Sequence, residues 1–147
     1  MKLSTKCRYG ARAMVEIARA HEQGLSTKRK DITANQGIPS SYLENILIDL
    51  RDKGLVATVR GPKGGFRLTK PADQITMLDV ISALRGPDML HVECLEDNYD
   101  CERKDACITR QVWVAMQKAQ DEVLRGITLK TLVLSDGTGL EKLDYVI

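Results

Sequence analysis

The chain has 147 residues, of which 43% are hydrophobic, so it can bury the core of one small domain with a helical extension. The net charge is only +2, but residues 1–70 carry 14 Lys/Arg against 6 Asp/Glu, a net of +8, whereas residues 71–147 carry 8 against 14, a net of −6. No apolar run approaches the roughly 18 to 20 residues of a membrane span, and the first residues lack the apolar core of a signal peptide, so we expect a cytoplasmic protein. A basic half attracts polyanions, which makes nucleic acid its leading partner.

Two helices are predicted at the start of the chain. Apolar residues recur at helical spacing after Ser4 or Thr5, either of which can cap a helix, and this first helix ends near Gly24. A second, short helix is predicted over residues 27–36. It stops at Gly37, because glycine suits the left-handed conformation that closes helices.

A third helix and a hairpin follow. The helix covers residues 40–53, with Ser41 and Glu44 at capping-box spacing. Residues 55–59 and 66–68 have strand character, and the Gly- and Pro-rich turn between them predicts an antiparallel hairpin.

The second half of the chain holds three further predicted helices, at residues 76–84, 108–126 and 128–133. Thr76 and Asp79 form a capping box at the start of the first of these, and Gly86-Pro87 follows its end. Residues 88–105 show no periodicity and are polar and acidic. We expect them to form an ordered loop only if something, such as a metal, ties them down.

This order of elements is typical of a winged helix-turn-helix, so the expected fold class is mainly α with a small β-hairpin wing. The third helix would enter the major groove. It presents Asn45, which can pair with adenine, and Glu44, which can accept a hydrogen bond from the amino group of cytosine. The other candidate DNA-binding residues are Ser40, Ser41 and Tyr42 on this helix and Arg60 and Lys63 on the wing, which would enter the minor groove.

Phosphate contacts would add affinity without sequence information, and the candidates for this role are Lys6, Arg8, Lys28 and Arg51. A structural interpretation competes with DNA reading. Ser41 and Glu44 would then only cap a helix, and the glycines would only turn the hairpin.

Three cysteines, Cys94, Cys101 and Cys107, lie in the irregular segment with gaps of six and five residues. Thiolates are the usual ligands of iron-sulfur clusters, and these gaps are longer than the Cys-x-x-Cys of zinc ribbons. Zinc and three unligated thiols remain alternatives. Cys7 lies on the apolar stripe of the first helix, where a buried and inert cysteine is expected.

The chain resembles the IscR and NsrR family of winged-helix regulators from residue 1 to about residue 134. Four segments carry the resemblance: Lys2 to Tyr9, Ile38 to Glu44, Val59 to Phe66, and Ile127 to Leu129. The three loop cysteines also fall where cluster-binding members of that family carry theirs.

The resemblance implies a homodimer held by the long helix after Cys107, a palindromic double-stranded DNA operator, and Arg60 in the minor groove. It also implies a 2Fe-2S or 4Fe-4S cluster on Cys94, Cys101 and Cys107, whose loss shifts the dimer between DNA-binding states. A cysteine-poor branch of the family binds no cluster.

The fourth cluster ligand stays open, because Arg110 stands where the IscR branch has a histidine and the first cysteine gap is one residue longer. The candidates are the partner subunit's Cys7 and, within the loop, His91, Glu93, Glu96 and Asp100.

We therefore divide the chain into a DNA-binding domain (1–86), a cysteine loop (87–107), and a dimerisation helix with a C-terminal segment (108–147). We expect a regulator that senses iron-sulfur status, iron, redox stress or nitric oxide. The alternatives are a cluster-free regulator with redox-active cysteines and an iron-sulfur redox protein that does not act on DNA. An enzyme is not expected, because neither of the two histidines lies in a catalytic motif.

Overall fold

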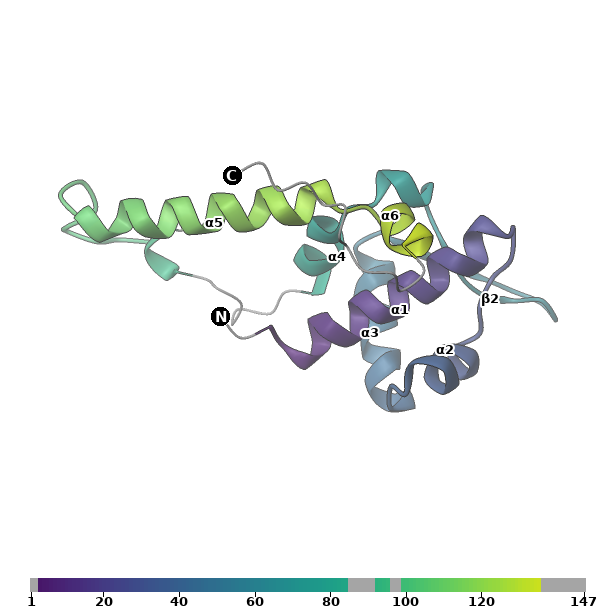
Figure 1. Cartoon of the computed structure of the whole chain (residues 1–147). Helices are drawn as coiled ribbons and strands as arrows, with labels where there is room; N and C mark the ends of the chain where they lie inside the picture. Colours follow the sequence, from purple (N-terminus) through teal and green to yellow (C-terminus); the bar gives the residue numbers. More distant parts are fainter. Residues whose placement is uncertain (1–2, 85–91, 96–98, 136–147) are drawn as a thin grey trace.

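The structure is a computed structural model that describes residues 3–84, 92–95 and 99–135 (Figure 1). The fold class is confirmed, since these residues form helices and one two-stranded antiparallel hairpin. In chain order the elements are α1 (Thr5–Glu22), α2 (Arg29–Gln36), α3 (Ser40–Asp52), β1 (Val56–Val59), β2 (Gly65–Leu68), the 3₁₀ turn η1 (Ala72–Gln74), α4 (Met77–Leu84), the 3₁₀ turn η2 (Glu93–Leu95), α5 (Ile108–Gly126) and α6 (Leu129–Leu134).

Helix α1 runs through the middle of the folded body, where it packs against α3, α4, α6 and β2. Ser4 caps it, since its hydroxyl accepts a hydrogen bond from the Cys7 amide at 3.1 Å. Its buried face contains Cys7, Ala13, Met14, Ile17 and Ala18, all of which are fully buried. The prediction of a buried Cys7 is therefore confirmed.

Helix α2 begins two residues later than predicted. The backbone of Thr27 is occupied elsewhere: its N–H donates to the Phe66 carbonyl at 3.0 Å, and the Phe66 N–H donates to the Thr27 carbonyl at 2.8 Å. This bridge joins the α1–α2 linker to the wing. The end of α2 is as predicted, with Gly37 in the left-handed conformation at φ 61°.

Helix α3 buries the stripe formed by Leu43, Ile46, Leu47 and Leu50. The predicted capping box between Ser41 and Glu44 is wrong. The residue that precedes α3 is Pro39, and no side chain caps the helix.

The wing pairs β1 with β2, and Val56 faces Leu68 at its base while Val59 faces Gly65 near its tip. A side chain at Gly64 would overlap the Val59 carbonyl oxygen and lie 2.7 Å from the Gly61 carbonyl oxygen. The turn therefore requires glycine at this position because the backbone folds back on itself.

Helix α4 starts with the predicted capping box: the Thr76 N–H donates to Asp79 Oδ2 at 2.8 Å, and the Asp79 N–H donates to Thr76 Oγ1 at 3.2 Å. The sequence did not predict η1 or η2. The predicted stop at Gly86-Pro87 lies outside the described residues.

Helix α5 leaves the folded body and extends away from it (Figure 1). None of its residues is buried in the single chain. Its C-terminal end is tied to the body by two backbone hydrogen bonds, from the Met77 N–H to the Ile127 carbonyl at 2.7 Å and from the Leu129 N–H to the Ile75 carbonyl at 2.9 Å. Near this end of α5, the partly buried Leu124 side chain packs against the core.

Gly10 provides a test of the packing around α1. A Cβ at this position would overlap the Leu84 side chain, which is 1% exposed and has little room to move. Replacing a helical glycine by alanine ordinarily stabilises by about 0.5–1 kcal/mol, but overpacking a core costs about 1–3 kcal/mol. We expect Gly10→Ala to lower the free energy of unfolding by about 1 kcal/mol or more in urea denaturation.

Gly126→Ala is the matched control, since an added Cβ there meets nothing within 4 Å. It should leave the free energy of unfolding unchanged or raise it. A Gly10→Ala protein at least as stable as the wild type would contradict the packing described here.

Candidate nucleic-acid interface and cysteine loop

The candidate residues of α3 all lie on its exposed side, opposite the buried stripe. They are Ser40, Ser41, Tyr42, Glu44 and Asn45. The helical repeat puts positions 40, 41, 44 and 45 on one face, so the structure brings together the side chains that the sequence selected. Their role in DNA binding stays a prediction.

The Tyr42 side chain packs against α1. Its ring meets the Tyr9 ring edge to face, with centroids 5.6 Å apart and planes at 87°. The Arg12 guanidinium in turn lies 5.8 Å from the centroid of the Tyr9 ring. Such contacts fix the direction of an aromatic side chain that is still 38% exposed.

Glu44 is held by a residue that the sequence analysis did not select. Arg29 Nη1, in the first turn of α2, lies 2.7 Å from Glu44 Oε2. Both side chains stay largely exposed, at 43% for Arg29 and 57% for Glu44.

The wing presents Arg60 and Lys63 to solvent, and neither forms an ion pair within the described residues. Its turn is anchored, because the Ser26 hydroxyl donates to the Lys63 carbonyl at 2.6 Å. Together with the bridge between Thr27 and Phe66, this contact fixes the wing to the α1–α2 linker.

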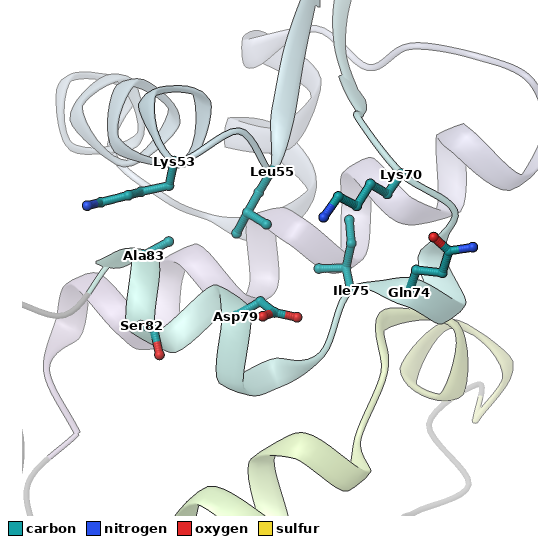
Figure 2. A pocket seen from close by; sticks show the side chains of 8 residues that line it. All are labelled: Lys53, Leu55, Lys70, Gln74, Ile75, Asp79, Ser82 and Ala83. Carbon is teal, nitrogen blue, oxygen red and sulfur yellow. The ribbon is translucent and has the colours of Figure 1, made fainter.

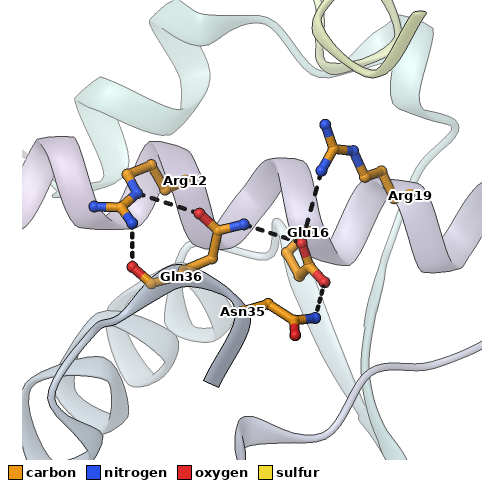
Figure 3. Close-up of polar contacts among 5 residues, drawn as sticks. All are labelled: Arg12, Glu16, Arg19, Asn35 and Gln36. Atoms are coloured by element: carbon orange, nitrogen blue, oxygen red, sulfur yellow. Dashed lines mark hydrogen bonds and ion pairs between the residues drawn. The ribbon is translucent and has the colours of Figure 1, made fainter. Parts of the chain in front are cut away.

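A polar network joins α1 to the end of α2 (Figure 3). Glu16 accepts hydrogen bonds from Asn35 Nδ2 at 2.6 Å and from Gln36 Nε2 at 3.0 Å, and Arg19 Nη1 lies 3.9 Å from it. Arg12 donates to the side-chain and backbone oxygens of Gln36. Hydrogen bonds to a charged group are stronger than neutral ones, so the network holds the turn before α3 in place.

Three of the candidate phosphate contacts are engaged within the chain. Arg8 Nη2 donates to Thr5 Oγ1 at 3.1 Å, and the other two form ion pairs. Lys6 Nζ lies 2.6 Å from Asp49 Oδ2, and Arg51 Nη2 lies 3.2 Å from Asp52 Oδ1. Lys28 is exposed and forms no ion pair in the part of the chain that the structure describes.

The three loop cysteines are half-buried free thiols on different local structures. Cys94 lies in η2, Cys101 begins a turn closed by the Lys104 N–H donating to its carbonyl at 3.0 Å, and Cys107 precedes α5. Arg110 Nε donates to the Cys94 carbonyl at 3.3 Å. This contact links η2 to the first turn of α5.

The surroundings of Cys107 favour its thiolate form. Its sulfur lies 3.3 Å from Thr109 Oγ1. The Thr109 hydroxyl, the backbone N–H of Arg110 and the charge of Arg103 hold the pKa of this thiol below its usual value, although some desolvation opposes them.

The donor chemistry suits an iron-sulfur cluster, but the geometry of the single chain does not. Within the described residues, no three His, Cys, Asp or Glu side chains are gathered closely enough to hold a metal ion. Cys7 is fully buried in the core, so it is not available to a partner subunit. Among the other candidate fourth ligands, Asp100 is exposed. His91, Glu96 and the side chain of Glu93 lie outside the part of the chain that the structure describes.

A hollow of about 430 Å³ lies between the end of α3, the base of the wing and α4 (Figure 2). Its lining contains Lys53, Lys70 and Asp79, and the Asp79 carboxylate is already used by the capping box of α4. The lining holds no histidine or cysteine. The Ser82 hydroxyl lies in the lining, but no imidazole is there to activate it, so the hollow holds no Ser-His pair.

Sequence reasoning missed the residues that act between elements. Ser26 and Arg29 follow no local pattern, because each binds a residue that is distant in sequence. The polar side chains at the end of α2 gave one usable signal, since amides next to a helix-closing glycine are well placed to bind a neighbouring helix.

Comparison with known proteins gives the family. A family model named Rrf2, described as an iron-dependent transcriptional regulator, matches residues 3–135. The chain belongs to the Rrf2 family. It is thus a DNA-binding transcriptional regulator and not an enzyme, and the resemblance drawn from the sequence is confirmed.

Individual relatives agree with the family. The chain is 39% identical over 132 residues to the HTH-type transcriptional regulator CymR of Bacillus subtilis, covering 90% of this chain and 89% of the relative. It is 38% identical over 133 residues to IscR of Pectobacterium carotovorum, covering 90% and 79%. The solved structure of T. potens IscR superposes with a TM-score of 0.75 at 33% identity, covering 94% and 90%. Among the described residues of this Rrf2-family chain, no helix combines the length and apolarity that crossing a membrane requires.

Proposed function

We propose that this regulator reads DNA with the exposed side of α3 in the major groove and with the wing in the minor groove. The observation that carries the proposal concerns the two sides of α3: its apolar stripe is buried, and its opposite side presents polar and aromatic side chains to solvent. The wing exposes two cations, Arg60 and Lys63. Asn45 would pair with adenine and Arg60 would enter the minor groove. These elements lie in the half of the chain with a net charge of +8.

We propose that the protein acts as a homodimer on a palindromic operator, with α5 as the contact between subunits. One side of α5 carries apolar side chains that are exposed in the single chain, with Ile108 at 84%, Val112 at 51% and Met116 at 51%. These residues recur every four positions along one side of the helix. Burying each apolar side chain contributes about 1.5–3 kcal/mol, so a face of this length favours association.

We propose that Cys94, Cys101 and Cys107 hold an iron-sulfur cluster and that its presence governs DNA binding. Three free, half-buried thiols in one loop support this proposal, as does the description of the family as iron-dependent. The cysteines are not gathered in the single chain, so cluster binding requires the loop to close around it. The cluster nuclearity and the fourth ligand are left open.

A cluster-free regulator that responds through thiol oxidation is the second candidate. The lowered pKa of Cys107 favours it, because the thiolate is the nucleophilic form of cysteine and is present at lower pH when the pKa is depressed. The separate placement of the three thiols also favours a cluster-free regulator.

The DNA-reading proposal predicts the effect of two truncations. The DNA is an operator duplex selected with the wild-type protein from random sequences. Asn45→Ala and Arg60→Ala should each weaken binding to this duplex by about 1–3 kcal/mol at constant salt, measured by fluorescence anisotropy. Arg125→Ala on α5 is the control for loss of an exposed cation and should leave the affinity nearly unchanged. Wild-type affinity in both test variants would contradict the proposal.

The dimer proposal predicts the effect of a charge on α5. Met116→Glu should convert the dimer to monomer at micromolar concentration, measured by sedimentation velocity, because a carboxylate would be buried in an apolar contact. Gln117→Glu carries the same charge on the opposite side of the helix and should remain dimeric. A monomeric wild-type protein, or a dimeric Met116→Glu variant, would rule out this interface.

The cluster proposal predicts the iron content and the visible absorbance of the purified protein. Protein purified without oxygen should contain iron and acid-labile sulfide and absorb visible light, and Cys101→Ser should lose all three properties. Cys7→Ala, which changes the buried cysteine, should keep them. Wild-type protein without iron and sulfide would exclude the cluster and favour the thiol-based candidate, and a coloured Cys101→Ser variant would remove Cys101 from the ligands.

A further inference from the structure

Arg29 forms an ion pair with Glu44, which is the one acidic side chain among the candidate DNA-binding residues. Its guanidinium reaches from the first turn of α2 to Glu44 on the next helix, with Nη1 and Oε2 2.7 Å apart. Within the described residues, Glu44 makes no other polar contact, so Oε1 has no protein partner. The pair therefore holds one carboxylate oxygen and leaves the other for a ligand.

The position of Arg29 is itself fixed. Helix α2 is held at its C-terminal end by the hydrogen bonds of Asn35 and Gln36 to Glu16, and Arg29 is the first of the eight residues of this short helix. The charge-assisted contact between Arg29 Nη1 and Glu44 Oε2 restricts the directions open to the Glu44 carboxylate. Glu44 is thus oriented by α2 as well as by its own helix.

Folding stability does not account for this pair. Both side chains are largely exposed, and exposed ion pairs contribute little to the stability of a protein. Docking on DNA changes the electrostatic surroundings of the pair. A lone carboxylate on this face would approach the phosphates and be repelled, and an adjacent cation within the screening length offsets that repulsion.

We propose that Arg29 is a specificity-determining residue: it orients Glu44 and compensates its charge, so that the free carboxylate oxygen accepts a hydrogen bond from a cytosine amino group in the major groove. This inference rests on the proposed DNA-reading function. Arg29 acts through Glu44 and need not touch a base. Without Arg29, the carboxylate would repel the backbone and lose its fixed direction, so the preference for cytosine would fall.

A double-mutant cycle on the full chain tests this coupling. The wild-type consensus is first selected from a library of random duplexes, and each cytosine in it is then replaced by thymine in separate duplexes. Arg29→Gln and Glu44→Gln should each reduce discrimination at one cytosine position per half-site by about three- to tenfold. Arg29→Gln should cause no further loss of discrimination in the Glu44→Gln background, and Arg29→Lys should restore part of it.

Lys28→Gln is the matched control, since it removes the same charge from the adjacent exposed residue. It should weaken binding to all duplexes by a similar factor and leave the discrimination unchanged. The inference is overturned if Arg29→Gln behaves like Lys28→Gln, if its effect is equal in both Glu44 backgrounds, or if no cytosine position depends on Glu44. A wild-type protein that binds no duplex even at low salt would instead overturn the proposed function itself, which distinguishes the two failures.

Discussion

The buried face of α1 is the constraint on which the rest of the structure depends. Met14 and Ile17 are fully buried, and α3, α4, α6 and β2 all pack around this helix. Because α3 must bury its apolar stripe against α1, its polar side is forced outward. The exposed surface of α3 is therefore a consequence of how the core is packed, and changes in the core would move α3 together with the candidate DNA-binding residues that it carries.

Polar contacts hold α2 and the wing in place, where apolar packing alone is small. Apolar packing sets the position of α3, but α2 is short and buries only Ile32, so it needs other anchors. Glu16 supplies them by binding both amides at the end of α2. The wing is likewise too small to hold its own position, and Ser26 and Thr27 attach it to the linker between α1 and α2. Two small elements thus gain a fixed orientation from a few hydrogen bonds.

The sequence predicted those features that depend on local pattern. Periodicity located the helices, and the capping box of Thr76 and Asp79 formed as expected. The same spacing at Ser41 and Glu44 failed, because α3 begins at Ser40 and Ser41 therefore lies inside the helix. The Glu44 carboxylate instead pairs with a distant residue, Arg29. Local spacing cannot rank a local contact against one that only the fold brings into reach. For the same reason the cysteine spacing predicted donors but not how far apart the chain holds them.

The exposure of α5 has a thermodynamic consequence. An isolated helix of its length is marginal in water, and only its C-terminal end packs against the core. The opposite end begins at Ile108, directly after Cys107, so the turn that sets the surroundings of this thiol belongs to the end of the helix that is remote from the core. Whatever covers the apolar face of α5 also orders that turn, and by linkage whatever orders the turn strengthens the covering contact. The free energy of subunit association and the reactivity of the cysteines would then be coupled, because α5 takes part in both.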